Sequence, residues 1–302
     1  MTLLNQSNMD TQESITMDHS SFSCRLCDGE AIPYPWIGIK PEWYGGECSS
    51  CGSISIRCVP SESELTAYYN DFNLHYDGGH EGGGNLIRYA RAYLSQVRRY
   101  VKKGSLIDVG SSTSPFPNVA AQAGFDVSVM DYVRPKNLDC GITYIQGNLN
   151  SQPQEAILEG YDVVTAWAVL EHTQNPVLAV QLLSEMCKVG GNILISIPEF
   201  GTAITRNSIG QTGWYSPPMH LHLPSPKAMR SVFLRFNLVM IDEGRLELNP
   251  FRYIARYSLG LVGALFGGIV RVLVSNKKWR SLRDKKIQKY SGIKYYVFVK
   301  IK

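Results

Sequence analysis

Short runs rich in hydrophobic residues alternate with amphipathic segments along most of the chain. The runs have the length of buried strands, whereas the amphipathic segments repeat their apolar residues at helical spacing. We predict strands at 105–110, 126–131, 142–147, 161–170, 192–198, 238–244 and 293–301, and helices at 62–77, 85–103, 116–123, 176–188 and 225–236. Buried strands that alternate with helices indicate an α/β fold, in which helices cover both faces of a parallel sheet.

Changes in composition along the chain indicate three regions. Residues 1–20 are polar and predict a disordered tail. Residues 21–61 contain two close cysteine pairs but little apolar surface, so we expect a small module that a metal stabilises. Residues 62–302 then form the α/β domain, which carries an apolar and basic insertion at about 247–291.

The two cysteine pairs have the spacing of zinc knuckles. Cys24 and Cys27 enclose two residues, and Cys48 and Cys51 repeat that spacing. Four thiolates arranged in this way hold zinc in a closed tetrahedral shell, which makes the ion structural. The alternative is four reduced cysteines in a small loop region. Because residues 1–21 contain no lysine, arginine or apolar run, we expect no secretory signal and a cytoplasmic protein.

The loop after the strand at 105–110 has the features of a nucleotide-cofactor site. The strand ends at Gly110, where small residues let the backbone approach a ligand and the next helix offers free N–H groups. Asp131 follows Asp108 by 23 residues and ends the next strand, a position from which an acid binds a ribose diol. A tight strand–helix turn in another kind of α/β enzyme is the alternative.

Four segments together resemble class I S-adenosylmethionine-dependent methyltransferases. They are DVGSSTS from Asp108, then Asp131, then YDVVTAWAVLEH from Tyr161, and Gly190-Gly191 before the strand that ends at Pro198. The four-cysteine start resembles a bacterial subgroup with an N-terminal zinc ribbon. The resemblance implies a Rossmann-like, seven-stranded, mostly parallel sheet with an antiparallel last strand. It also implies methyl transfer from S-adenosylmethionine to an oxygen or carbon of a sugar or related small molecule, in polysaccharide or secondary-metabolite biosynthesis.

The same resemblance implies a set of cofactor-binding residues. They are Asp108, Gly110, Ser111, Ser112, Asp131, Tyr132, Asn148, Ala166 and Trp167. The first four would line the methionine moiety, Asp131 would bind the ribose, and Tyr132 and Asn148 would contact the adenine. Ala166 and Trp167 would lie beneath the cofactor. Ser112 and Ser114 occupy positions where the family often has glycine, so the loop is narrower than usual.

Three histidines are candidates for the base that accepts a proton from the methyl acceptor. His172 follows the strand at 161–170, and His220 and His222 follow the strand at 192–198. All three positions lie toward the carboxyl edge of the sheet, where open α/β sheets bind ligands. A histidine with a pKa near neutrality can take this proton. The alternative is a structural role in the loops for each of them.

Charge is distributed unevenly along the chain. The formal net charge is +4, but residues 271–302 contain eleven basic residues and one acid. The uncharged run at 257–270 is shorter than the roughly 20 residues that span a bilayer. Apolar and basic residues together favour contact of 250–290 with the inner face of the membrane, and a packing helix or dimer interface is the alternative.

Two further functions are consistent with these features. A zinc knuckle with a basic tail would suit an RNA-modifying methyltransferase, although residues 1–270 are net acidic. A loop with serine in place of glycine would suit a methyltransferase-like scaffold without catalysis. We favour the small-molecule or glycan acceptor, with no nucleic-acid partner.

Overall fold

The computed structural model describes residues 20–33, 44–75, 83–150, 160–198, 217–246 and 293–302. The predicted tail, apart from Ser20, and the predicted insertion at 247–291 lie outside these residues, and so does the proposed membrane contact at 250–290. Within the described part of the chain, no helix is both long and apolar enough to cross a bilayer.

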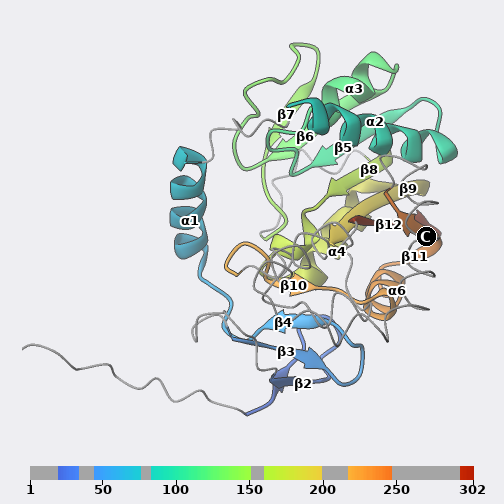
Figure 1. The fold of residues 1–302 in the computed structure, drawn as a ribbon. Coiled ribbons are helices and arrows are strands. Elements are labelled where there is room, and N and C mark those ends of the chain that lie inside the picture. Colours follow the sequence, from blue (N-terminus) through green and yellow to red (C-terminus); the bar gives the residue numbers. More distant parts are fainter. Residues whose placement is uncertain (1–19, 34–43, 76–82, 151–159, 199–216, 247–292) are drawn as a thin grey trace, which may run out of the picture.

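A seven-stranded sheet forms the centre of the protein (Figure 1). Its strands are β5 (Ser105–Val109), β6 (Asp126–Asp131), β7 (Thr143–Gln146), β8 (Tyr161–Trp167), β9 (Cys187–Pro198), β11 (Leu238–Arg245) and β12 (Ile293–Lys300). The order is β11-β12-β9-β8-β5-β6-β7. β5 to β9 pair in parallel, whereas β12 runs antiparallel to both β9 and β11. This arrangement confirms the predicted Rossmann-like sheet with its antiparallel last strand.

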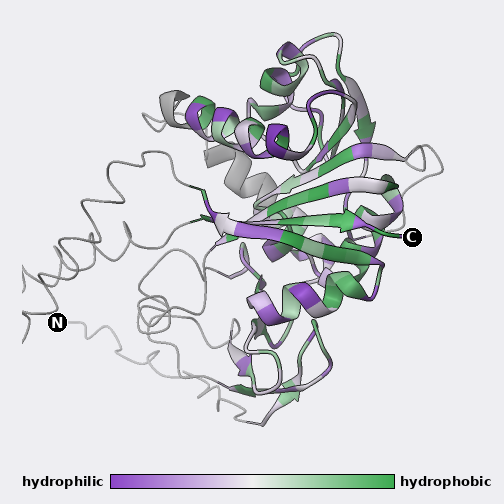
Figure 2. Cartoon of the chain, turned by 90° about the vertical axis from the view of Figure 1, so that its right-hand side faces the viewer, coloured by the Kyte–Doolittle hydropathy of each residue, from purple (hydrophilic) through white to green (hydrophobic). Residues whose placement is uncertain are grey.

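Helices cover both faces of this sheet. They are α2 (Gly83–Tyr100) and α3 (Phe116–Gln122) on one face, and α4 (Pro176–Met186) and α6 (Pro226–Leu234) on the other. Hydrophobic colour follows the central strands, and hydrophilic colour marks parts of the helices (Figure 2). α6 begins as its sequence predicts, because the Ser225 hydroxyl accepts a hydrogen bond from Ala228 N at 3.1 Å and Pro226 follows the cap.

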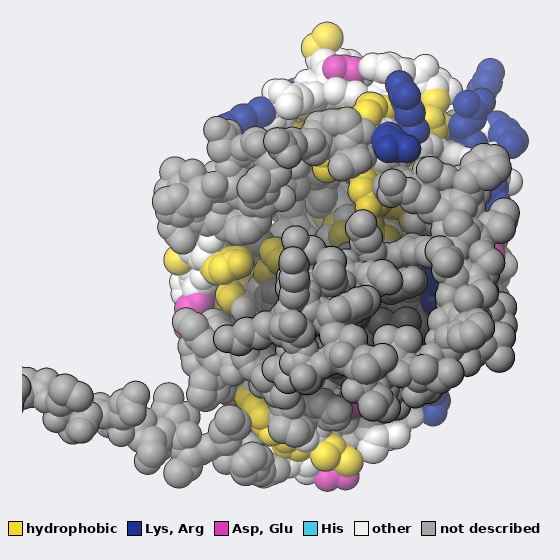
Figure 3. Space-filling model, in the orientation of Figure 1, with side chains coloured by type: hydrophobic (Ala, Val, Ile, Leu, Met, Phe, Trp, Pro, Cys, Tyr) yellow, Lys and Arg dark blue, Asp and Glu magenta, His cyan; other side chains and the backbone are white. Residues whose placement is uncertain are grey.

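The outer face of α2 is basic. Lysine and arginine side chains gather over this helix in Figure 3. Arg91, Arg98 and Lys102 are exposed there, whereas Ala90 and Val97 on the opposite side of the helix are fully buried against the sheet. The helix is therefore amphipathic, as its spacing of apolar residues predicts.

A second, smaller sheet lies at the N-terminal end. Its strands are β1 (Phe22–Ser23), β2 (Glu30–Pro33), β3 (Gly45–Cys48), β4 (Ile54–Ile56) and β10 (His222–Leu223), all antiparallel and in that order. We call the described residues up to 61 the ribbon. The helix α1 (Glu62–His75) follows it, and Ser61 and Glu64 close its first turn with reciprocal hydrogen bonds. Because β10 comes from the α/β domain, the ribbon does not complete its sheet alone.

Two strand boundaries differ from the prediction by three residues or more. β8 ends at Trp167, since Ala168 has a left-handed backbone with φ of 56°, and residues Leu170–His172 form a short 3₁₀ helix, η3. β9 begins at Cys187 and continues through the two glycines that were expected to precede it. The first difference is at the carboxyl end of β8 and the second at the start of β9. At neither end does the alternation of apolar and polar residues mark where the strand stops.

Candidate functional site

A cavity of about 230 Å³ opens at the carboxyl ends of β5 and β8. Its lining comprises Leu86, Tyr89, Tyr93, Asp108, Gly110, Ser111, Ser114, Trp167 and Ile293. Open α/β sheets bind ligands at this edge. Four of the residues predicted to bind a cofactor, namely Asp108, Gly110, Ser111 and Trp167, therefore meet in one cavity.

The loop after β5 is held close to the neighbouring elements. Gly110 has φ of 71°, and a Cβ atom there would lie 2.8 Å from a methyl group of Val169. This position requires glycine on both conformational and steric grounds. Ser112 also has a left-handed backbone, with φ of 47°. This conformation costs a residue with a side chain about 1–2 kcal/mol. The Ser112 N–H donates to Asp131 Oδ2 at 2.7 Å, which fixes this turn.

Asp131 ends β6 and faces the turn. Its Oδ1 accepts a hydrogen bond from the Tyr132 N–H at 2.7 Å, and the backbone of Val133 contributes a third hydrogen bond to the carboxylate. An ionised carboxylate has about four acceptor positions, so Asp131 keeps capacity for a ligand hydroxyl. Burial raises the pKa of Asp131, and the backbone donors oppose that rise.

Asp108 is the buried acid of the cavity, with an exposed fraction of 1%. Thr165 Oγ1 donates to its Oδ1 at 2.6 Å, and Ser111 Oγ donates to its Oδ2 at 2.6 Å. Burial nevertheless raises the pKa of Asp108 to about 7, because the two hydroxyl donors only partly replace water. A cationic ligand group would favour the ionised form of this carboxyl.

Aromatic rings form one wall of the cavity. Tyr93 from α2 stacks on Trp167 with ring centroids 4.1 Å apart, and Phe116 packs edge-on against Trp167 at 5.5 Å. The indole Nε1 of Trp167 is buried and has no hydrogen-bond partner among the described residues. Buried polar atoms normally have a partner, so this N–H is available to a bound molecule. Sequence reasoning had treated Tyr93 only as part of the apolar face of its helix.

The other five predicted cofactor residues do not line this cavity; Ser112 and Asp131 form the turn described above, and the remaining three lie elsewhere. Ala166 is fully buried and packs in the cluster on the α4 side of the sheet. The Asn148 side-chain oxygen accepts a hydrogen bond from Asn150 N at 2.7 Å and so shapes its own turn. Tyr132 is half exposed beside Asp131. Adenine contacts by Asn148 and Tyr132 stay predictions, whereas the burial of Ala166 favours a packing role.

His172 and His220 lie together beyond β8. Their rings are 4.7 Å apart, and His172 Nδ1 lies 2.7 Å from the carbonyl oxygen of Met219. Burial, together with the charge on His220, lowers the pKa of His172 to about 3. His172 is therefore neutral at physiological pH, but with this low pKa it is a much weaker base than the near-neutral histidine that the sequence analysis expected. We call His172 and His220 the histidine pair.

Glu171 is a fully buried acid beside this pair, which the sequence analysis had not singled out. One of its carboxylate oxygens lies 4.0 Å from His172 Nε2. Neither of the two carboxylate oxygens has a hydrogen-bond partner among the described residues. Burial raises the pKa of Glu171 to about 8, so the carboxyl is mostly protonated at neutral pH. A protonated His172 would lower this pKa by direct charge attraction.

His222 lies apart from the histidine pair, in β10 of the ribbon sheet. It is fully buried, and its Nδ1 lies 3.2 Å from Ser55 Oγ. An acceptor in the cavity has no access to this fully buried side chain in the ribbon sheet. This placement favours a structural role for His222 over the catalytic one that its sequence position suggested.

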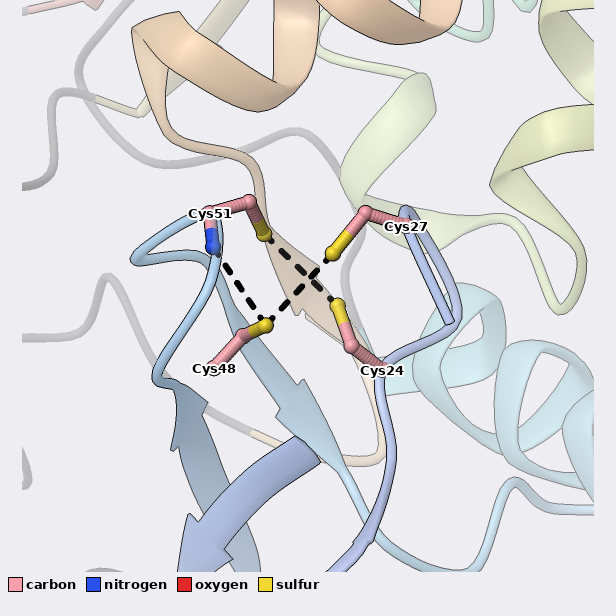
Figure 4. Close-up of side chains that lie close together, drawn as sticks. All are labelled: Cys24, Cys27, Cys48 and Cys51. Atoms are coloured by element: carbon pink, nitrogen blue, oxygen red, sulfur yellow. Dashed lines mark hydrogen bonds between the residues drawn. The ribbon is translucent and has the colours of Figure 1, made fainter. Parts of the chain in front are cut away.

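The four predicted metal ligands converge in the ribbon (Figure 4), and Cys24, Cys48 and Cys51 belong to the same buried cluster as residues of α4 and α6. The Sγ atoms of Cys24 and Cys51 are 3.7 Å apart, and those of Cys27 and Cys48 are 3.5 Å apart. A tetrahedral zinc ion with sulfur ligands at about 2.3 Å separates them by about 3.8 Å, so the cluster fits zinc. Hydrogen bonding between Cys24 and Cys51 lowers the pKa of Cys51 and raises that of Cys24.

Comparison with known proteins identifies the family. A family model described as a methyltransferase domain matches residues 85–243, which is more than half of the chain. The chain belongs to this methyltransferase domain family. The matched segment contains β5 to β9, most of β11 and the cavity residues from Leu86 to Trp167.

Curated relatives of this chain are ubiquinone biosynthesis O-methyltransferases. The protein from Photorhabdus laumondii is 28% identical over 34% of this chain and 47% of its own length. The protein from Pectobacterium atrosepticum is 29% identical over 34% of this chain and 46% of its own length. The chain thus spans about half the length of these relatives.

A solved structure supports the fold. The 1,6-didemethyltoxoflavin-N1-methyltransferase of Burkholderia thailandensis superimposes with a TM-score of 0.54 at 11% identity, covering 89% of this chain and 99% of its own. That structure contains 1,6-didemethyltoxoflavin and S-adenosylhomocysteine. At this identity the likeness shows the shared fold alone.

Proposed function

We propose that this protein transfers a methyl group from S-adenosylmethionine to an oxygen or carbon of a sugar or a related small molecule. The observation that carries the proposal is the cavity at the β5–β8 edge, which combines Asp108, Gly110 and Trp167 inside the methyltransferase family match. The names of the curated relatives support an oxygen acceptor. The bound S-adenosylhomocysteine in the Burkholderia structure supports the cofactor.

When bound, S-adenosylmethionine supplies an electrophilic methyl group on a sulfonium centre. In the proposal, ionised Asp108 attracts the ammonium group of the methionine moiety, and Asp131 accepts hydrogen bonds from the ribose diol. The unpartnered Trp167 N–H donates into the cavity. These contacts fix the cofactor so that alignment with the acceptor provides much of the rate.

The histidine pair carries the proton transfer in this proposal. An acceptor hydroxyl loses its proton as its oxygen attacks the methyl group, and neutral His172 or His220 receives that proton. The ionised form of Glu171, with a carboxylate oxygen 4.0 Å from His172 Nε2, would stabilise the imidazolium and so raise the low pKa of His172. His172 is partly exposed, whereas Glu171 is fully buried, so only the histidine can meet an acceptor.

Replacing His172 with glutamine is expected to slow methyl transfer by about 10²- to 10⁴-fold, the usual contribution of a positioned base. Transfer of label from tritiated S-adenosylmethionine to nucleotide-linked sugars measures the rate. Affinity for S-adenosylhomocysteine should change less than twofold, because the cavity lining does not include this residue. Unchanged transfer by the variant would assign the proton to another group.

Cofactor affinity is expected to increase with pH around neutrality. The pKa of Asp108 is raised to about 7, and only the ionised form, which dominates above this value, attracts a cation. Affinity for S-adenosylmethionine should therefore increase from pH 6 to pH 8 and level off above. The variant Asp108→Asn should bind more weakly and lose this dependence. Calorimetric titrations at several pH values measure the affinity of the wild type and of the variant. If the affinity of Asp108→Asn depended on pH as steeply as that of the wild type, Asp108 would not be the group responsible.

The four-cysteine cluster is proposed to hold a structural zinc ion. Its donor set is closed and sulfur-only, and three of its four cysteines are buried. Zinc would therefore support the ribbon rather than react with substrate.

A further inference from the structure

The segment 219–225 connects the ribbon to the histidine pair. We infer that the four-cysteine knuckle positions His172 and His220 through this segment, so that metal loss displaces the pair while cofactor binding persists. The inference depends on the proposed function only for the role of the two histidines in methyl transfer. The contacts that transmit the effect are present in the structure itself.

Leu221 lies in the middle of the segment and is bonded on both sides. Its N–H donates to the carbonyl oxygen of Glu171 at 2.8 Å, and its own carbonyl oxygen accepts from Ile56 N at 2.9 Å. The next residue, His222, pairs with Ser55 in β4. The segment therefore links the last ribbon strand directly to the residue that precedes His172.

The loop that contains Ser50, Cys51 and Ser53, which we call the knuckle loop, forms hydrogen bonds with the end of the segment. Ser225 N donates to Ser53 Oγ at 2.9 Å, and the Ser225 hydroxyl donates to the carbonyl oxygen of Cys51. Lys227 Nζ adds a hydrogen bond to the carbonyl oxygen of Ser50 at 2.7 Å. Cys51 is one of the four candidate ligands, so the position of the segment depends on the loop that the metal would order.

Both histidines depend on the same segment. His220 belongs to it, and His172 Nδ1 is held 2.7 Å from the carbonyl oxygen of Met219. The two rings contact each other edge-on. A shift of 219–221 would therefore move His220 directly and remove the hydrogen-bond partner of His172.

The cofactor cavity is built from other parts of the chain. Its described lining comes from α2, the loop after β5, β8 and β12, and includes no residue of the ribbon or of 219–225. Displacement of the segment should consequently leave the cofactor contacts in place. This separation distinguishes a positioning role from support of the whole fold.

The ribbon strands need the metal to keep their arrangement. β1 to β4 contain between two and four residues each, which is short even for strands in a larger sheet. In small modules of this kind, metal-binding energy is folding energy. The order of the knuckle loop, and with it the Ser225 contacts, should therefore follow metal occupancy.

Metal removal with a chelator, followed by NMR of the histidine rings, tests the inference without knowledge of the acceptor. In the stripped protein we expect the pKa of His172 to rise by at least two units from about 3, since its ring becomes hydrated, and the His220 signals to move as well. Affinity for S-adenosylhomocysteine should stay within threefold. Added zinc should restore the original signals.

A variant tests the same link with the metal in place. Ser225→Ala removes the hydroxyl contact to Cys51 and, with it, the cap of α6, whereas the control Ser231→Ala removes a hydroxyl that bonds within α6 to the carbonyl oxygen of Ala228. Ser225→Ala should move the His172 and His220 signals in the same direction as metal removal, while Ser231→Ala should not.

Unchanged histidine signals in the stripped protein and in Ser225→Ala would overturn the inference. Loss of S-adenosylhomocysteine binding on metal removal would overturn it as well, because the ribbon would then support the entire fold. Failure of the untreated protein to bind S-adenosylhomocysteine would contradict the proposed function instead, and the histidine signals would still decide the positioning role.

Discussion

Replacing Asp131 with alanine is expected to abolish the stabilisation that S-adenosylhomocysteine gives to the wild-type protein. Hydrogen bonds to a charged group contribute about 1.5–3 kcal/mol each, so loss of two ribose contacts should weaken binding at least about 100-fold. A ligand at 100 times its dissociation constant stabilises the folded state by about 2.7 kcal/mol. At that concentration the melting temperature should rise for the wild type and stay nearly constant for the variant.

Asp126→Ala is the control for this experiment, because Asp126 is an exposed acid at the opposite end of the same strand, β6. It should retain the full shift in melting temperature. Equal shifts in all three proteins would show that the cofactor does not reach the carboxyl end of β6.

Replacing Cys51 with serine is expected to release the zinc and lower the melting temperature of the ribbon. Structural zinc in small modules binds with about 10–16 kcal/mol, and every 1.4 kcal/mol lost weakens binding tenfold. Loss of one of four thiolates should therefore reduce zinc content from one ion per chain to almost none after dialysis. Elemental analysis by mass spectrometry measures this content.

Cys58→Ser provides the matched comparison, since Cys58 is exposed and lies outside the cluster. That variant should keep one zinc ion per chain and the wild-type melting temperature. A wild-type protein that carries no zinc after expression in zinc-supplemented medium would contradict the structural-metal proposal.

The central sheet was predictable because its signal is local. Each of the strands β5, β6, β8 and β9 presents a run of apolar residues that is buried on both faces, and the intervening helices have their own period. Ser225 and Pro226 likewise marked the start of α6 from two adjacent positions. In these places the residues that determine the structure are neighbours in the chain.

The connection between the ribbon and the sheet was not predictable in this way. β10 has only two residues, too few to show any period, and His222 meets Ser55 across 167 positions. The sequence therefore suggested an exposed catalytic role for a histidine that is fully buried. Tyr93 presents the same difficulty, because an apolar helix position predicts burial but does not distinguish a core contact from a cavity wall.

Glu171 illustrates why the chemistry of the site needed the structure. The sequence analysis did not single it out, whereas the structure shows that it is completely buried, and burial raises its pKa. The cofactor residues Asp108, Gly110 and Ser111 were easier to find, because the turn after β5 places them together within four residues.

Calorimetric titration of the zinc-loaded, wild-type protein with S-adenosylmethionine at pH 8 tests the central claim most directly. At this pH Asp108, with its pKa near 7, is mostly ionised. We expect saturable binding at one site per chain with a dissociation constant in the micromolar range. Absence of binding heat up to millimolar concentrations, in a protein that is folded and carries its zinc, would contradict the assignment of the β5–β8 cavity as a cofactor site.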